Sequence, residues 1–158
     1  MPTFSFEFQV NAPVKAVAAF HYGADAFKKL SPPPIFAQIH DFPPVAEGSE
    51  AEFTLWIGPL PLRWRAMHRD VTAQGFTDIQ QSGPLQSWQH VHRFIAVSPT
   101  TTRVADHIRY SHKTGWRGLL SRILFNPFGL FALFTARKWL TRWHTRRATS
   151  FVVENTEW

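Results

Sequence analysis

The sequence predicts an α+β fold in which a strongly curved antiparallel sheet is closed by one long C-terminal helix. Segments that alternate between apolar and polar residues follow one another at regular spacing up to about residue 111. Two short helical segments stand between the first of these strands and the others. After residue 126 a helical pattern runs almost unbroken to about residue 153. At 158 residues the simplest interpretation is one domain over residues 1–158.

The first strand is predicted over residues 3–10, because apolar side chains recur there at every second position. Its apolar face consists of Phe4, Phe6, Phe8 and Val10. Short helices are expected over residues 14–22 and 24–30, separated by Gly23. The prolines at residues 32–34 cannot continue a helix, so the second helix must end before them.

Strands are next expected over residues 35–42, 49–57 and 62–71. The first of the three is poorly patterned, whereas the other two alternate clearly. Their predicted inward residues are Ala51, Phe53, Leu55, Ile57, Leu62, Trp64, Ala66 and His68. Three arginines alternate with the inward residues of the last strand and mark its solvent-facing side, so His68 is expected to point inward.

The most informative stretch is a hairpin predicted over residues 76–94, in which a tight turn at Gly83-Pro84 joins two strands. Residues two apart share a face of a strand. One strand therefore groups Phe76, Asp78 and Gln80, and the other groups Trp88, His90, His92 and Phe94. If these faces point inward, they line a mostly apolar, concave interior with a few polar groups, which is the usual character of a small-molecule site.

A last strand over residues 101–111 adds an ionisable group to this interior. Its predicted inward face consists of Val104, Asp106, Ile108 and Tyr110. Residues 114–125 indicate a loop with some helical content, and Asn126-Pro127 indicates a helix entry. A stripe along the long helix predicts the face that packs on the sheet: Leu133, Ala136, Leu140, Trp143 and Phe151.

Composition narrows the classes of partner. Cysteine is absent, which excludes a disulfide, a thiolate nucleophile and a cysteine-ligated metal. The N-terminal residues lack the pattern of a signal peptide, so a cytoplasmic location is expected. The formal charge is +6, and much of the excess lies late, at Arg137, Lys138, Arg142, Arg146 and Arg147. These residues indicate either a solvated helix face or attraction to an anionic partner, and without a recognised module no nucleic acid is expected.

Residues Leu119–Phe134 form an unusually apolar stretch with basic residues on both sides. Spanning a bilayer needs ~20 uninterrupted apolar residues, and this stretch is shorter and contains Asn126-Pro127. Two interpretations remain. It is either a helix start buried against the sheet, or an interfacial segment that makes peripheral membrane contact.

The hairpin carries a resemblance to a known family. The run G-F-x-D-x-Q-x-x-G-P-L-x-x-W-x-H-x-H-x-F from Gly75 to Phe94, followed by Asp106 and Tyr110, resembles the START-like superfamily, also called SRPBCC or Bet v 1-like. Its small polyketide cyclase/dehydrase-like and coenzyme-Q-binding-like members are the most similar branch. Leu85 stands where a phenylalanine is expected. The resemblance implies a helix-grip fold, a sheet wrapped around the C-terminal helix, with a cavity for a hydrophobic ligand between them.

The main functional hypothesis is binding or carriage of a small hydrophobic molecule: a lipid, an isoprenoid or a polyketide-like compound. The predicted ligand-binding residues are Phe53, Leu55, Trp64, His68, Phe76, Asp78, Gln80, Trp88, His90, His92, Phe94, Asp106, Tyr110, Phe131 and Leu140. The polar members either orient the ligand or bond only to one another. No cofactor is expected, and the ligand's identity and the oligomeric state stay open.

Two alternatives use the same polar residues. A cyclase or dehydratase would use a histidine as general acid or base beside a carboxylate, with His90, His92, Asp78 and Asp106 as the candidates. A metal site would use the His-x-His pair together with His68 and a carboxylate. Histidines on a strand more often form hydrogen bonds in a core, so no metal is predicted.

Overall fold

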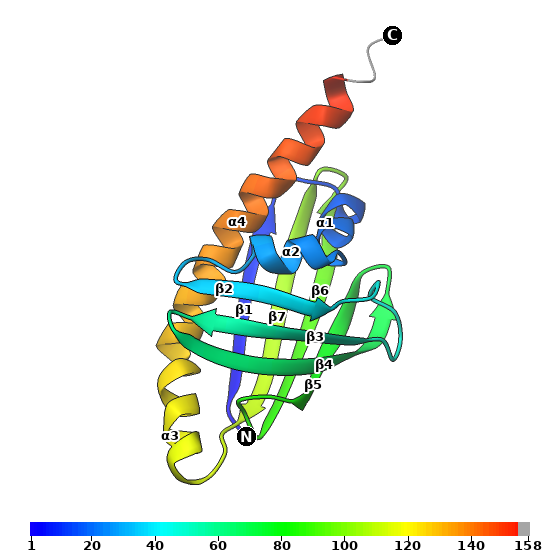
Figure 1. Cartoon of the computed structure of the whole chain (residues 1–158). Helices are drawn as coiled ribbons and strands as arrows, with labels where there is room; N and C mark the ends of the chain where they lie inside the picture. The colour runs from blue at the N-terminus through cyan, green and yellow to red at the C-terminus, as the bar shows by residue number, and fades with distance from the viewer. Residues whose placement is uncertain (155–158) are drawn as a thin grey trace.

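The computed structural model describes the backbone of residues 1–154 and the side chains of residues 1–146 apart from residue 24. Within this part of the chain, seven antiparallel strands form one sheet in the order β1-β7-β6-β5-β4-β3-β2. The strands are β1 (Thr3–Val10), β2 (Ile35–Asp41), β3 (Glu50–Ile57), β4 (Leu60–Thr72), β5 (Gly75–Ser82), β6 (Ser87–Ser98) and β7 (Thr101–Ser111). The sheet bends so strongly that β2, β3 and β4 cross in front of β1, β7 and β6 (Figure 1). This is the curved antiparallel sheet that the sequence predicts.

Register shifts explain part of the bend. The ladder between β4 and β5 shifts between Arg65 and Ala66 and again between Arg69 and Thr72. An extra residue on one strand kinks that strand and increases its twist. Asp70 lies inside the second shift with a left-handed φ of 51°, and its side chain accepts a hydrogen bond from the Thr77 hydroxyl at 3.2 Å. The bend therefore falls in the strand that carries His68 to the inner face.

The predicted hairpin is present, because β5 and β6 pair from Gly75↔Arg93 to Ile79↔Gln89. Its connection is four residues long, Gly83 to Gln86, rather than the tight two-residue turn that Gly83-Pro84 predicted. Gln80 explains the difference, because its side-chain amide donates to the Leu85 carbonyl at 2.9 Å and holds the loop against β5. Leu85 itself is buried, so the loop closes one end of the core.

Four helices lie in the described part of the chain: α1 (Val14–His21), α2 (Ala24–Lys29), α3 (Gly115–Leu124) and α4 (Pro127–Glu154). The segment expected to be a loop with some helical content is thus mostly the regular helix α3. Pro127 opens α4 as predicted, and the Asn126 Oδ1 accepts a hydrogen bond from the Gly129 backbone N–H at 2.9 Å. Figure 1 shows α4 running along the sheet and extending past its end.

The predicted packing stripe of α4 was correct at Leu133, which packs against the core and lines the cavity, and wrong in phase farther along the helix. The helix buries Leu130, Phe134, Thr141 and Thr145, whereas Trp143 on the predicted stripe is 48% exposed. The buried positions follow a helical repeat but include two threonines, which hydropathy alone does not mark as inward. Thr145 satisfies its hydroxyl by donating to the Thr141 carbonyl at 2.7 Å. Phe151, also assigned to the stripe, lies outside the described side chains.

The inward faces of the strands are as the period of two predicts. Two apolar clusters fill the concave side, one around Trp64, Ile108 and Phe134 and the other around Phe8, Val17 and Phe94. The arginines of β4 point outward, and Arg65 pairs with Glu50 at 2.8 Å on that surface. Between the two clusters lies a polar group of histidines and aspartates, and this group and the space beside it form the candidate site.

Candidate functional site

A cavity of about 130 Å³ lies between the concave face of the sheet and the helices. Its wall is mostly apolar and aromatic. Of the predicted ligand-binding residues, nine line it: Phe53, Leu55, Trp64, His68, Phe76, Asp78, Trp88, His90 and His92. They come from four neighbouring strands, β3 to β6, which explains why residues so far apart in sequence meet.

Six predicted residues do not line the cavity. Phe94 and Tyr110 are buried in the core, and Asp106 lies behind the cavity wall, bonded to the histidines. Gln80 supports the loop after β5. Phe131 is 59% exposed, although its ring touches Phe6, and Leu140 lies beyond the cavity on α4. The two helical residues therefore lie away from the cavity, whereas Phe94, Asp106 and Tyr110 are buried within the protein.

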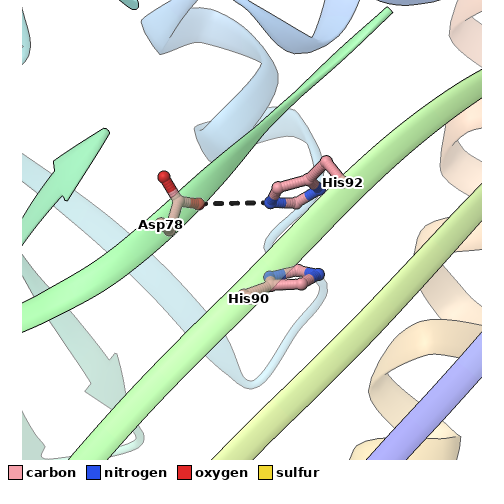
Figure 2. Close-up of side chains that lie close together, drawn as sticks. All are labelled: Asp78, His90 and His92. Atoms are coloured by element: carbon pink, nitrogen blue, oxygen red, sulfur yellow. Dashed lines mark hydrogen bonds and ion pairs between the residues drawn. The ribbon is translucent and has the colours of Figure 1, made fainter. Parts of the chain in front are cut away.

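Three histidines and two aspartates form a continuous chain of contacts, here called the His–Asp network: His68, Asp78, His92, Asp106 and His90. The two carboxylates alternate with the three imidazoles along it. His92 is the central residue, with its Nε2 3.1 Å from Asp78 Oδ2 (Figure 2) and its Nδ1 3.0 Å from Asp106 Oδ1. His90 Nε2 lies 2.9 Å from the same Asp106 oxygen. Cross-strand register produces these contacts, because Asp78 pairs with His90 in the β5–β6 ladder and His92 with Asp106 in the β6–β7 ladder.

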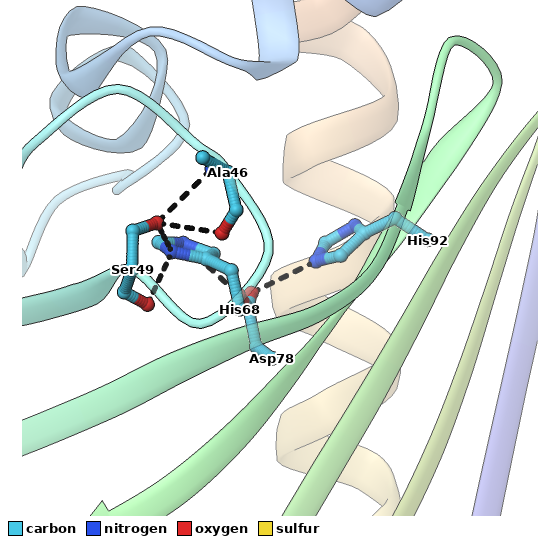
Figure 3. Close-up of polar contacts among 5 residues, drawn as sticks. All are labelled: Ala46, Ser49, His68, Asp78 and His92. Atoms are coloured by element: carbon cyan, nitrogen blue, oxygen red, sulfur yellow. Dashed lines mark hydrogen bonds and ion pairs between the residues drawn. The ribbon is translucent and has the colours of Figure 1, made fainter.

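The other end of the network reaches Ser49, in the turn before β3. His68 Nε2 lies 3.3 Å from Asp78 Oδ1, and its Nδ1 donates to the Ser49 carbonyl at 3.1 Å (Figure 3). The Ser49 hydroxyl is fixed in turn by the backbone of Ala46, at 2.9 Å to the carbonyl and 3.0 Å from the N–H. The bend of β4 and the turn before β3 therefore set the ring of His68 in place.

The charges of the network follow from burial and bonding. Burial disfavours the charged form of His92, but the hydrogen bonds that His92 donates to Asp106 and Asp78 outweigh burial and raise the pKa of His92 to about 9. Burial opposes ionisation of Asp106 too, yet hydrogen bonds from His90 and His92 hold the pKa of Asp106 far below its usual range. The pKa of Asp78 is lowered in the same way. At neutral pH, His92 is therefore an imidazolium between two carboxylates.

His90 is the uncharged member of the central group. Burial and the neighbouring cation of His92 lower the pKa of His90 to about 4. The centroids of the His90 and His92 rings lie 3.7 Å apart, and at this distance only one of the two rings carries a charge. Because Asp106 is ionised and can only accept, the proton of neutral His90 is on Nε2. Its Nδ1 is then a hydrogen-bond acceptor on a residue that lines the cavity.

Two polar residues of the cavity wall were not predicted: His21 and Arg137. His21 Nδ1 donates to the Val17 carbonyl at 2.8 Å, and burial lowers the pKa of His21 to about 4, so its Nε2 is an acceptor. Arg137 was assigned with the late basic residues to a solvated face or an anionic partner, but it lines the cavity. Its Nε donates to the Leu30 carbonyl at 3.1 Å, and no carboxylate of the described residues lies within 4.0 Å of it.

A metal ion is a further use that these residues allow by distance. One ligand atom each from Asp78, His90 and His92 lies within 4.8 Å of the others. A metal, however, needs deprotonated imidazoles. The imidazolium of His92 has both N–H groups bonded to carboxylates, so an ion would have to displace a proton whose pKa is raised to about 9. The donor set therefore fits a proton better than a metal.

The sequence left open whether the apolar stretch Leu119–Phe134 is buried against the sheet or exposed at an interface, and the structure shows residues of both kinds in it. Phe125, Leu130 and Phe134 are buried against the sheet, whereas other large apolar residues of the stretch are exposed. Among the described helices none alone has the length and hydropathy to cross a membrane; only α3 taken together with residues 127–146 of α4 does, and the two are bent by 42°. The expectations of a single domain and of a cytoplasmic location stay predictions.

Comparison with known proteins identifies the fold. No known family profile and no curated protein sequence matches the chain. Among solved structures, the Zhui aromatase/cyclase from Streptomyces sp. R1128 aligns with a TM-score of 0.75 and 12% identity over 94% of this chain and 95% of that chain. Protein CV1439 from Chromobacterium violaceum aligns with a TM-score of 0.72 and 8% identity over 90% and 96% of the two chains.

A START superfamily protein from Mycobacterium smegmatis aligns with a TM-score of 0.63 and 15% identity, over 86% of this chain and 94% of that chain. Identities this low carry a shared fold and no shared activity. The order of the elements, the curved seven-stranded sheet and the long α4 agree with the predicted resemblance. The chain has the helix-grip fold of the START-like superfamily.

Proposed function

We propose that this protein binds and carries a small hydrophobic molecule whose polar end meets Arg137 in the cavity. One observation carries the proposal. The cavity wall is mostly apolar, and three of its four histidines contact Asp78 or Asp106 in the His–Asp network, so Arg137 and the free ring nitrogens of His21 and His90 are among the few polar groups left to face a ligand. Buried polar groups that are already satisfied favour an apolar guest, since they gain little from a polar one.

The size of the cavity limits the ligand. A water position needs ~10–15 Å³ of such space, so the volume of about 130 Å³ holds roughly ten water-sized groups. That space suits one or two rings, or a short segment of an isoprenoid, lipid or polyketide-like chain. Removing ~150 Å² of apolar ligand surface from water contributes about 4 kcal/mol before the entropy of binding is subtracted. This contribution alone corresponds to a dissociation constant of about 1 mM, so simple apolar probes are expected to bind weakly.

The polar groups at the wall define the ligand's polar end. The guanidinium of Arg137 can only donate, and burial lowers the pKa of Arg137 while the charges of Asp106 and Asp78 raise it. His90 Nδ1 and His21 Nε2 can only accept as neutral imidazoles. A ligand that carries a carbonyl, a phenolic oxygen or a carboxylate next to an apolar ring would use Arg137 directly.

A probe series tests both parts of the proposal. Trp64 and Trp88 line the cavity, so quenching of tryptophan fluorescence can follow the binding of naphthalene, 2-naphthol and 2-naphthoate. We expect saturable binding of all three, tightest for 2-naphthoate. Arg137→Gln should weaken 2-naphthoate about tenfold, the value of one charge-assisted bond, and leave naphthalene unchanged. Native mass spectrometry of gently purified protein identifies any natural ligand.

Lys138→Gln is the matched control, because Lys138 is the next residue on α4 and does not line the cavity. A thermal melt of each variant checks that the loss of the Arg137–Leu30 bond has not unfolded the site. If Arg137→Gln and Lys138→Gln changed the affinity for 2-naphthoate equally, Arg137 would not contact the ligand. The proposal that the cavity binds an apolar molecule would still stand. Absence of saturable binding for all three probes would overturn the proposed function itself.

A second candidate function is acid–base catalysis, for example a cyclisation or dehydration. The His90–Asp106 pair favours it, as does the shared fold with an aromatase/cyclase. Two features oppose it. A general base works best with a pKa near 7, and that of His90 is lowered to about 4. His92, the available acid, has both N–H groups bonded to carboxylates. Binding is therefore the stronger proposal.

A further inference from the structure

The outer side of α3 and the first half of α4 exposes six large apolar side chains, here called the α3–α4 surface. They are Trp116, Leu119, Ile123, Phe128, Phe131 and Trp139, and their exposed fractions lie between 59% and 87%. Exposed apolar groups that occur singly are normal, whereas a contiguous group marks a site of interaction. Figure 1 shows α3 followed by α4 along one side of the sheet, and three of these residues lie on α3 and three on α4.

The helical phase explains why these side chains are left uncovered. In α3 the three exposed residues recur at intervals of three and four, and Gly118 and Ser121 are buried instead. In α4 the inner side is already occupied by Leu130 and Phe134, which pack in the core. The helices therefore bury one apolar face in the protein and present a second apolar face outward.

The charge around this surface has one sign. From Gly115 to Val153 the chain contains no aspartate or glutamate. Arg117 and Arg122 lie on α3, and Lys138 and Arg142 lie on α4. The cations stand beside the exposed rings, with the Arg117 guanidinium 5.5 Å from the Trp116 ring and the Lys138 ammonium 5.5 Å from the Trp139 ring. Aromatic rings beside basic groups are typical of surfaces that lie at a membrane–water interface.

We propose that the α3–α4 surface docks on an anionic phospholipid membrane, with the two helices lying along the interface. The apolar side chains would enter the boundary between headgroups and acyl chains, and the basic residues would meet the lipid phosphates. A second copy of the chain is a poorer partner. A two-fold contact through the same surface would bring the basic residues of both copies together, which is unfavourable. The charge of the surface therefore selects a lipid partner.

Docking would also place the cavity next to the membrane. The inner side of α4 supplies Leu130, Leu133 and Phe134 to the cavity wall, and Phe125 joins them from the link between α3 and α4. One segment thus contacts lipid on its outer face and the proposed ligand on its inner face. The docking proposal itself depends only on the outer face and stands whether or not a ligand binds.

Vesicle co-sedimentation of the full chain tests the proposal. We expect binding to phosphatidylcholine vesicles that contain phosphatidylglycerol, and at least about tenfold weaker binding to phosphatidylcholine alone, since each nearby cation contributes about fivefold on an anionic surface. The double variant Leu119→Ser with Phe128→Ser should lose at least about tenfold in binding. Arg117→Gln with Arg122→Gln should lose a similar factor on anionic vesicles only.

Matched controls lie on other parts of the surface. Phe36 on β2 is 65% exposed, so Phe36→Ser removes an equally exposed ring outside the α3–α4 surface. Arg103→Gln with Arg109→Gln removes two exposed cations from β7. Equal losses in these controls, or equal binding to both kinds of vesicle, would overturn the proposal. A third outcome would also overturn the proposal. In it, the protein binds no vesicles but forms a dimer in size-exclusion chromatography, and the Leu119 and Phe128 substitutions dissociate that dimer.

Discussion

The concave interior and the α3–α4 surface contain the same kinds of residue, aromatic rings and basic groups, but they differ in how charge is paired. Inside, the imidazoles of the His–Asp network alternate with carboxylates, and their nitrogens lie 2.9–3.3 Å from carboxylate oxygens. Outside, basic residues stand beside exposed rings without a single acidic residue from Gly115 to Val153. These contacts occupy most of the polar atoms of the network, which favours an apolar guest in the cavity beside it. Unbalanced charge leaves the outer surface fit for an anionic partner.

Burial makes the difference in pairing necessary. A buried charge without a partner costs several kcal/mol, so each ionised group of the interior needs an opposite charge or several hydrogen bonds. An exposed cation is solvated and needs neither. Arg137 stands between these two cases, because it lines the cavity without a carboxylate within ion-pair distance among the described residues. It is therefore the interior residue that most resembles the outer surface, and the one we assign to the ligand.

The largest expected effect comes from breaking the pairing inside. Asp106→Ala removes the carboxylate that bonds both His90 and His92, and leaves the cation of His92 with one partner. Breaking a buried pair on one side costs about 3–5 kcal/mol. We expect a loss of that size in the free energy of unfolding, measured by urea denaturation at neutral pH.

The control for Asp106 is Asp41→Ala, because Asp41 is exposed at the end of β2. Its loss should change the free energy of unfolding by less than about 0.5 kcal/mol. A cost for Asp106→Ala no larger than that of the control would show that the interior charges are not paired as described, and the contrast with the outer surface would fail.

The second effect is a dependence of stability on pH. The pKa of His92 is about 9 in the folded protein and about 6.5 when unfolded, so the folded state holds this proton more tightly. The stabilisation is fully present below pH 6.5 and is lost as the pH rises to 9, by about 3 kcal/mol. His90 and His21, with pKa values lowered to about 4, act in the opposite sense and cost stability as the pH falls from 6.5 to 4. Unfolding should therefore require the most free energy near pH 6.5.

Denaturation series at several pH values measure this profile. His92→Gln keeps a hydrogen-bonding side chain but removes the titration, so the decline above pH 6.5 should flatten while the acid side persists. A decline of the same size in His92→Gln would assign the alkaline effect to another group. Stability that stays constant from pH 6.5 to 9 in the unsubstituted protein would contradict the imidazolium at His92.

The sequence predicted the interior better than the helices, for a physical reason. A strand has a period of two, so a single inward residue such as Trp64 fixes the orientation of its neighbours, and His68, His90 and His92 pointed inward as expected. A long helix has a period of 3.6 and tolerates polar residues on its buried face. Thr141 and Thr145 are buried there, and the predicted phase was wrong in consequence.

Tertiary context explains the site residues that were missed. Arg137 belongs to a run of basic residues and differs from Lys138 only in its position around α4. His21 ends a short helix, and nothing local indicates that α1 lies over the cavity. The sequence held one signal that Arg137 points inward. Arg137 lies three positions after Phe134, on the same face of α4 as the buried residues Leu130 and Phe134.

The smallest expected effect is that of a substitution at His90, and it tests whether His90 only supports Asp106 by a hydrogen bond or also transfers a proton. His90→Gln keeps an N–H donor for Asp106, so the free energy of unfolding should fall by less than about 1.5 kcal/mol. The affinity for naphthalene should not change, because in the proposed function His90 acts through its bond to Asp106 rather than through proton transfer. Fluorescence titration and denaturation of the same preparation measure both quantities. If 2-naphthol binding falls tenfold while naphthalene binding and stability do not, the free Nδ1 of His90 contacts the ligand's hydroxyl. The Nδ1 acceptor of His90 would then join the Arg137 guanidinium in positioning the polar end of the ligand.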